Sequence, residues 1–181
     1  MRVIGAAAVV AALMLVSAGS AGAVTMVDFG GGHGDPYDQD GFSFAPARIV
    51  NGNCLNSGGC LGLNDNETTT MARSGSGAFS LTGLSFNLLG KGTGNSLTVT
   101  GSNGRSLSFD LSSYSKNGYH SLLFSDEFAN VSSVTFSTGG GGNVRIDDLS
   151  AAPVPLPAAG WLLIGGLGAI GALRRRWRAA A

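Results

Sequence analysis

Residues 96–111 read SLTVTGSNGRSLSFDL, and this stretch decides the fold. Leucine, valine and phenylalanine alternate with small polar residues on both sides of Asn103-Gly104. Successive side chains of a β-strand point to opposite faces of a sheet, so each half predicts a strand with one buried and one polar face. Asparagine and glycine both accept the positive φ angles of a tight turn. The stretch therefore predicts a β-hairpin.

The same pattern extends through residues 24–152. Short apolar runs separated by glycine-rich turns supply further candidate strands: Thr25–Phe29, Phe42–Phe44, Arg48–Val50, Phe79–Leu81, Leu84–Leu88, Tyr119–Phe124, Val134–Phe136 and Val144–Ile146. All nine phenylalanines lie in this region and can supply a core. About nine short strands with frequent turn signals predict an all-β domain built as an antiparallel two-sheet sandwich.

Charge is distributed unevenly along the 181 residues, although the formal net charge is zero. Five of the 11 basic residues stand in the two ends: Arg2, Arg174, Arg175, Arg176 and Arg178. The middle keeps the other six against all 11 acidic residues. Nucleic-acid binding needs clustered lysine and arginine to neutralise phosphates, so we expect no nucleic-acid partner.

The first 23 residues predict a secretory signal peptide. Arg2 supplies a positive n-region, Val3–Val16 an apolar h-region, and Ala21 and Ala23 an A-x-A cleavage signal. We expect cleavage after Ala23 by signal peptidase, following export by the secretion machinery. The alternative is an uncleaved anchor, for which the h-region is short.

The C-terminal segment, residues 153–181, predicts a membrane span. Leu156–Leu173 contains no charge, and as a helix it would be ~27 Å long, about the thickness of a bilayer core. The cluster Arg174–Arg176 would stay on the cytoplasmic side. The prolines Pro153, Pro155 and Pro157 hold the preceding chain extended, a conformation that a protease or transpeptidase site accepts.

This tail resembles the VPLPA variant of the PEP-CTERM sorting signal. The match comprises the motif, the apolar span and the basic cluster, with Val154, Pro155, Leu156, Pro157 and Ala158 followed by Arg174, Arg175 and Arg176. The resemblance implies a protein exported by a Gram-negative bacterium and recognised by an exosortase-type membrane enzyme. It implies a transient anchor in the inner membrane, then the cell surface or extracellular matrix, in association with exopolysaccharide or biofilm. A permanent single-span anchor is the alternative.

Cys54 and Cys60 are the only cysteines, and both lie in a loop rich in glycine, asparagine and serine. In an exported protein such a close pair predicts a small disulfide. Zinc binding is not expected, because zinc takes four ligands and no histidine lies nearby in the sequence.

Carboxylates near the two ends of the domain predict a calcium site: Asp28, Asp147 and Asp148. Asp148 is in phase with the inward-facing residues Val144 and Ile146, whereas Asp147 is expected to face out. This middle region loosely resembles jelly-roll modules of the carbohydrate-binding and MAM-like kinds, which implies a jelly-roll sandwich with a structural metal. Gly30 stands where those modules have an acidic ligand. Hydrogen-bonded or solvated aspartates are the alternative, and no other cofactor is expected.

Catalysis has no motif in this sequence. His33 and His120 belong to no recognisable arrangement, and there is no G-x-S-x-G nucleophile elbow. We therefore expect a non-enzymatic structural or adhesive component that contacts glycans. Tyr37, Tyr114 and Tyr119 offer stacking surfaces for sugars if exposed, or are half-buried strand residues. Two alternatives stay open: an envelope enzyme acting on polysaccharide, which needs two opposed carboxylates, and a calcium-stabilised adhesin.

Overall fold

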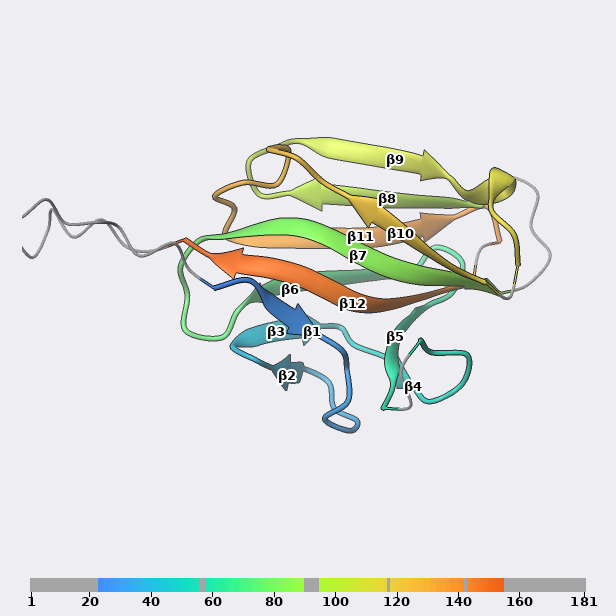
Figure 1. The fold of residues 1–181 in the computed structure, drawn as a ribbon, viewed down its shortest axis with the longest axis horizontal. Coiled ribbons are helices and arrows are strands. Elements are labelled where there is room, and N and C mark those ends of the chain that lie inside the picture. Colours follow the sequence, from blue (N-terminus) through green and yellow to red (C-terminus); the bar gives the residue numbers. More distant parts are fainter. Residues whose placement is uncertain (1–22, 56–57, 90–94, 117, 142, 155–181) are drawn as a thin grey trace, which may run out of the picture. The chain divides into compact units, whose positions relative to one another are not determined.

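The computed structural model describes residues 23–55, 58–89, 95–116, 118–141 and 143–154, which fold as a two-sheet β-sandwich (Figure 1). Sheet A has the order β10 (Tyr119–Leu123), β7 (Phe79–Leu89), β12 (Asn143–Pro153), β5 (Cys60–Leu63) and β4 (Ile49–Val50), and β1 (Thr25–Val27) pairs with β12. Sheet B has the order β2 (Tyr37–Gln39), β3 (Phe42–Ala45), β6 (Thr68–Arg73), β11 (Ser133–Gly139), β8 (Ser96–Gly101) and β9 (Ser106–Asp110). All recorded pairings are antiparallel, so the predicted jelly-roll-like sandwich is confirmed.

The hairpin predicted from residues 96–111 is present. Strands β8 and β9 pair in register from Ser96 opposite Asp110 to Thr100 opposite Ser106. Gly104 in the turn has φ +82°, a backbone conformation that side chains disfavour. A short 3-10 helix, Leu111–Ser113, follows β9, and Asp110 caps it by accepting a hydrogen bond from the Ser112 N–H.

The core lies between the two sheets. Eight phenylalanines are buried: Phe29, Phe42, Phe44, Phe79, Phe86, Phe124, Phe128 and Phe136. The ninth, Phe109, is partly buried against this core. Edge-to-face ring pairs link the layers, such as Phe42 with Phe79 at a centroid distance of 5.3 Å. This confirms the expectation that the phenylalanines build the core.

Several strand boundaries differ from the sequence prediction. Phe79–Leu81 and Leu84–Leu88 are one strand, β7, whose inward phase changes at Thr82-Gly83. Strands β2, β5 and β6 were not predicted, because their residues do not alternate between apolar and polar. Strand β12 continues to Pro153, which the sequence assigns to the sorting segment, and the Val154 N–H donates to the Ala78 carbonyl (3.0 Å).

Two predicted segments lie outside the described residues. They are residues 1–22 of the signal peptide and the sorting segment from residue 155 onward. Within the described ranges, no helix has both the length and the hydropathy that a bilayer crossing requires. The predicted cleavage after Ala23, the predicted span and the predicted sorting residues from Pro155 onward therefore stay predictions.

Candidate functional site

Exposed apolar side chains gather on the outer face of sheet A. Within the described ranges, the exposed large hydrophobic residues are Val24 (64%), Met26 (58%), Leu55 (43%) and Leu123 (86%). Three of them line one groove, and the backbone N–H of the fourth, Leu55, is bonded to Asp147 of β12 on the same face. A groove rimmed by exposed apolar side chains is a candidate binding site.

A single row of residues crosses the sheet beneath this groove. In register from β10 to β1, the row is Leu123, Gly83, Ser150 and Met26. The two edge positions are large and exposed, and the two central positions are small. A Cβ at residue 83 would stand 3.0 Å from the Leu122 carbonyl oxygen and 3.2 Å from Leu123 Cδ2. Any side chain would be crowded at this position, so glycine leaves the floor of the groove without one. The row therefore forms a trough with apolar rims.

The floor of the groove is polar. Ser85 and Ser121 lie opposite each other on β7 and β10, with their hydroxyl oxygens 3.3 Å apart. Thr82 donates its hydroxyl to the Ser150 carbonyl (3.1 Å), and Asp148 also lines the groove. The volume is about 360 Å³, within the roughly 300–1,000 Å³ typical of small-ligand sites. Apolar rims above a hydroxyl-bearing floor suit an amphiphilic ligand.

A β-bulge in β12 sets the positions of the two neighbouring aspartates. The register shifts between Asp147 and Ser150, and Asp148 has φ +45°. Leu149 takes the next inward position, so the predicted inward orientation of Asp148 is wrong: it is half-buried and lines the outer groove. Asp147 is the fully buried carboxylate, and it lies under the disulfide-bonded loop.

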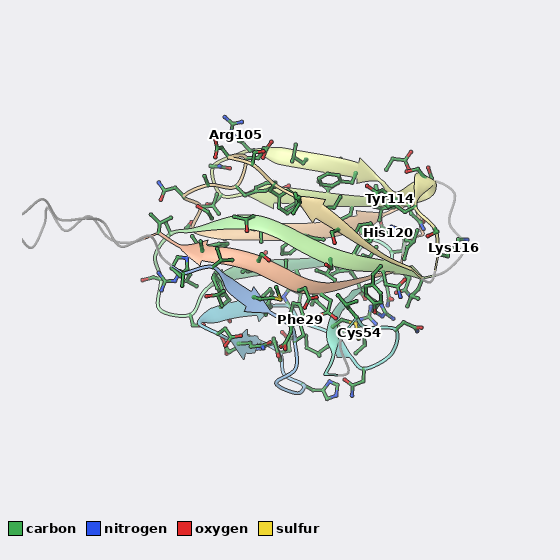
Figure 2. All side chains as sticks on the ribbon, viewed as in Figure 1. Phe29, Cys54, Arg105, Tyr114, Lys116 and His120 are labelled. Carbon is green, nitrogen blue, oxygen red and sulfur yellow. A yellow bond between two sulfur atoms is a disulfide. The ribbon has the colours of Figure 1, made fainter. Side chains whose placement is uncertain are left out.

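The residues Asn53, Cys54 and Leu55, here called the 53–55 arm, cover part of this face. Cys54 forms the predicted disulfide with Cys60, with Cα atoms 5.4 Å apart, and it is labelled in Figure 2. The Asn53 carbonyl accepts the Tyr119 O–H (2.6 Å) and the Asn87 Nδ2–H (3.2 Å), and the Leu55 N–H donates to Asp147 Oδ2 (2.9 Å). These bonds fix the arm to β10, β7 and β12.

The Tyr119 hydroxyl donates to the arm. Partial burial raises the pKa of Tyr119, and the nearby negative charges of Asp147 and Asp148 raise it further, although a hydrogen bond with Asn87 opposes the shift. The shift moves the loss of this donor to more alkaline pH, and the protonated phenol donates to the Asn53 carbonyl. Sequence reasoning missed this contact because the two residues are 66 positions apart.

The three carboxylates predicted to bind calcium have protein partners. Asp28 Oδ1 accepts from Gln39 Nε2 (2.6 Å) and from the Gly30 N–H (3.0 Å). Asp147 accepts from the Leu55 and Asp148 backbone. Nowhere in the described part of the chain do three or more His, Cys, Asp or Glu side chains form a group that could hold a metal ion. Calcium binding stays a prediction, and a melting temperature that EDTA leaves unchanged would contradict it.

Asp28 makes folding stability depend on pH. The Gln39 side chain and then the Gly30 N–H lower the pKa of Asp28 below its ordinary value. A lowered folded-state pKa stabilises the fold above the unfolded pKa of about 3.9, and this stabilisation is lost as the pH falls through the folded-state value. We expect Asp28→Asn to lower the free energy of unfolding by about 1 kcal/mol at pH 7 and by less at pH 3. Urea unfolding at both pH values measures this.

The companion variant Gln39→Met removes the main partner of Asp28 while leaving the carboxylate. It should weaken the same pH dependence, because Gln39 Nε2 is the closest donor to Asp28 Oδ1. Equal losses at pH 7 and pH 3 in both variants would show that the Asp28 carboxylate is not held in this way.

The three tyrosines do not form an exposed platform. Tyr37 is 3% exposed and packs against Phe29 and Phe44. Tyr114 is partly buried and packs edge-to-face on Phe86 (5.2 Å), and Tyr119 is half-buried under the 53–55 arm. Tyr119 in β10 is the half-buried strand residue that the alternative describes, whereas Tyr37 in β2 is buried and Tyr114 follows the 3-10 helix.

A second cavity, of about 340 Å³, lies where the β5–β6 turn meets the β3–β4 connection. Arg48 and Glu67 line it and form an ion pair at 3.0 Å, with both side chains more than a third exposed. Partial burial alone would raise the pKa of Glu67, but bonds from the Asn64 N–H and from Arg48 bring it below its usual value. A half-exposed pair of this kind positions the turn and adds little stability.

Comparisons with known proteins found loose likenesses. No family model matches the chain, and no curated protein matches it. Among solved structures, TmCBM61 in complex with β-1,4-galactotriose is 12% identical, with a TM-score of 0.36, over 75% of this chain and 90% of that chain. A mutant of CBM29-2 complexed with mannohexaose is 17% identical, with a TM-score of 0.44, over 74% of this chain and 93% of that chain.

A third similar structure is the C-terminal family 22 carbohydrate-binding module of Clostridium thermocellum Xyn10B. It is 9% identical, with a TM-score of 0.41, over 72% of this chain and 93% of that chain. At these scores the likeness is loose, so what the groove of this chain binds follows from its own residues alone.

Proposed function

We propose that this chain is a non-enzymatic glycan-binding component of the cell exterior, and that the groove on the outer face of sheet A is its binding site. The supporting observation is the row Leu123–Gly83–Ser150–Met26 with the hydroxyls of Ser85 and Ser121 beside it. A pyranose ring has apolar C–H faces and a rim of hydroxyls. The apolar rims of the groove fit the faces, and its serines and Asp148 fit the hydroxyls.

The single carboxylate among the described residues that line the groove favours binding over hydrolysis. Glycoside hydrolysis uses two opposed carboxyl groups flanking the bond. Of the described residues that line the groove, one is acidic, Asp148. The neighbouring Asp147 is fully buried and accepts the Leu55 N–H, so it is out of reach of a sugar.

Export and sorting are the second part of the proposal. The tail from Pro153 to Ala181 resembles the VPLPA sorting signal, so an exosortase-type enzyme would process the protein at the inner membrane and deliver it to surface or matrix polysaccharide. Val24 lines the groove and directly follows the predicted cleavage site at Ala23. Removal of the signal peptide there would place the mature N-terminus beside the groove.

Binding is tested by changing the rim of the groove. Leu123→Asp places a charge on a side chain that is 86% exposed, so the fold should be unaffected. We expect the Kd for neutral oligosaccharides to rise about tenfold, because one apolar rim is lost. Isothermal titration calorimetry with mannose, xylose, glucose and galactose oligomers measures this.

The matched control is Arg105→Ala, at an exposed turn between β8 and β9 of sheet B that does not line the groove. It should leave the Kd unchanged. If none of these oligomers binds, or if the rim variant binds as well as the natural chain, the groove is not a glycan site.

Sorting is tested in a Gram-negative host that makes the exosortase. Replacing Arg174–Arg176 by alanine together with Pro155 and Pro157 should leave an uncut precursor in the inner membrane, because the basic cluster and the extended motif are both lost. Intact mass of the exported protein is the measurement, and it also reports cleavage after Ala23 and the disulfide. A mature mass equal to that of the natural chain would contradict the sorting proposal.

A further inference from the structure

The outer face of sheet A is open at one end of its strands and covered at the other. Three cross-strand pairs of β10 and β7 face outward in succession: Leu123–Gly83, Ser121–Ser85 and Tyr119–Asn87. The first two pairs line the groove, whereas both residues of the third pair are hydrogen-bonded to Asn53 of the 53–55 arm. The groove thus follows the strands for two pairs and then meets the arm.

The arm sits directly on the sheet and leaves no passage beneath it. Asn87 is 4% exposed and Asp147 is 0% exposed, although both point to the outer face opposite or beside open groove residues. Their burial comes from the arm, which bonds to both, and the disulfide joins the arm to β5. A ligand lying along the groove therefore cannot continue between the arm and the sheet.

The opposite end of the groove has no comparable cover in the described part of the chain. Val24 and Thr82 line it there, and Val24 is 64% exposed. The distance along β7 from Gly83 to the closed end at Asn87 is four residues, ~13 Å at 3.3 Å per residue, enough for about two sugar rings.

We propose that the groove accepts the end of a glycan chain and that the 53–55 arm excludes internal segments. This inference rests on the proposed glycan function and specifies its substrate class. An internal segment would need to leave the groove in both directions along the strands, and the arm blocks one of them. About two terminal sugars fit, with the chain leaving past Val24.

The test uses the full chain in nanodiscs of zwitterionic lipid, which accommodate the apolar tail. The probes are the neutral oligosaccharides that bind, from disaccharide to hexasaccharide, in natural form and with either the reducing or the non-reducing end chemically blocked. We expect the Kd to level off by the trisaccharide, within about twofold thereafter, and one of the two end blocks to raise it about tenfold or more.

An open groove gives a different pattern. Affinity that keeps rising to the hexasaccharide, together with no effect of either end block, would overturn terminal recognition and leave glycan binding intact. Absence of binding, or binding that Leu123→Asp does not weaken, would remove the glycan function and this inference together. The two failures are therefore distinguishable.

A variant of the arm gives an independent readout. Tyr119→Phe combined with Asn87→Ala removes both donors to the Asn53 carbonyl and keeps the disulfide. We expect the preference for an unblocked end to shrink, and the hexasaccharide to gain affinity relative to the disaccharide. Arg105→Ala is the control and should keep both properties. An unchanged preference in the arm variant, with its circular dichroism spectrum intact, would show that the arm is not the closed end.

Discussion

Phe86→Ala should lower the free energy of unfolding by about 3–5 kcal/mol, the range measured for phenylalanine truncation in well-packed cores. Phe86 is 0% exposed at the centre of β7. Its ring packs on Tyr114 at 5.2 Å and on His120 at 5.5 Å. The truncation leaves a cavity beneath β10 and beneath the segment that follows the 3-10 helix, and β10 cannot move into it without breaking its pairing with β7. Such a loss is a large part of the ~5–15 kcal/mol that stabilises a typical domain.

Urea unfolding measured by circular dichroism checks this value. The matched control is Leu123→Ala on β10, where the side chain is 86% exposed and the change should cost less than about 0.5 kcal/mol. A loss below about 1 kcal/mol for Phe86→Ala would show that the aromatic cluster does not join β10 to the core.

Replacement of both cysteines by alanine should lower the free energy of unfolding by about 2–3 kcal/mol. Loss of the constraint on so short a loop accounts for about 2 kcal/mol in the chain-entropy description. The remainder comes from the arm: when its position is less fixed, Asp147 loses its bond from the Leu55 N–H in a fully buried site. The same variant should bind long oligosaccharides better relative to short ones, because the closed end of the groove opens.

Reducing agent distinguishes the disulfide from the side chains themselves. Dithiothreitol should bring the natural chain close to the unfolding midpoint of the Cys54→Ala, Cys60→Ala variant and should leave that variant unchanged. An unfolding midpoint that neither the reducing agent nor the substitutions alter would mean that the arm is held without its covalent link.

The sequence predicted the disulfide but not the groove. The disulfide was predictable from two nearby cysteines in an exported chain. The groove was not, because its row joins Met26, Gly83, Leu123 and Ser150, which stand in four strands and in no shared motif. The available signal was leucine and methionine at strand positions that alternate with the core positions. A strand sequence does not show which of its two faces is covered.

Local alternation and turn chemistry by themselves determined that this chain forms an antiparallel sandwich with its phenylalanines inside, because side-chain direction in a strand repeats every two residues. Tertiary structure alone decided which strands became neighbours, where the bulge turned Asp148 outward, and where the 53–55 arm landed. Those outcomes depend on contacts between residues far apart in the chain, such as Leu55 with Asp147, which are 92 positions apart. Such pairs leave no periodic trace in the sequence.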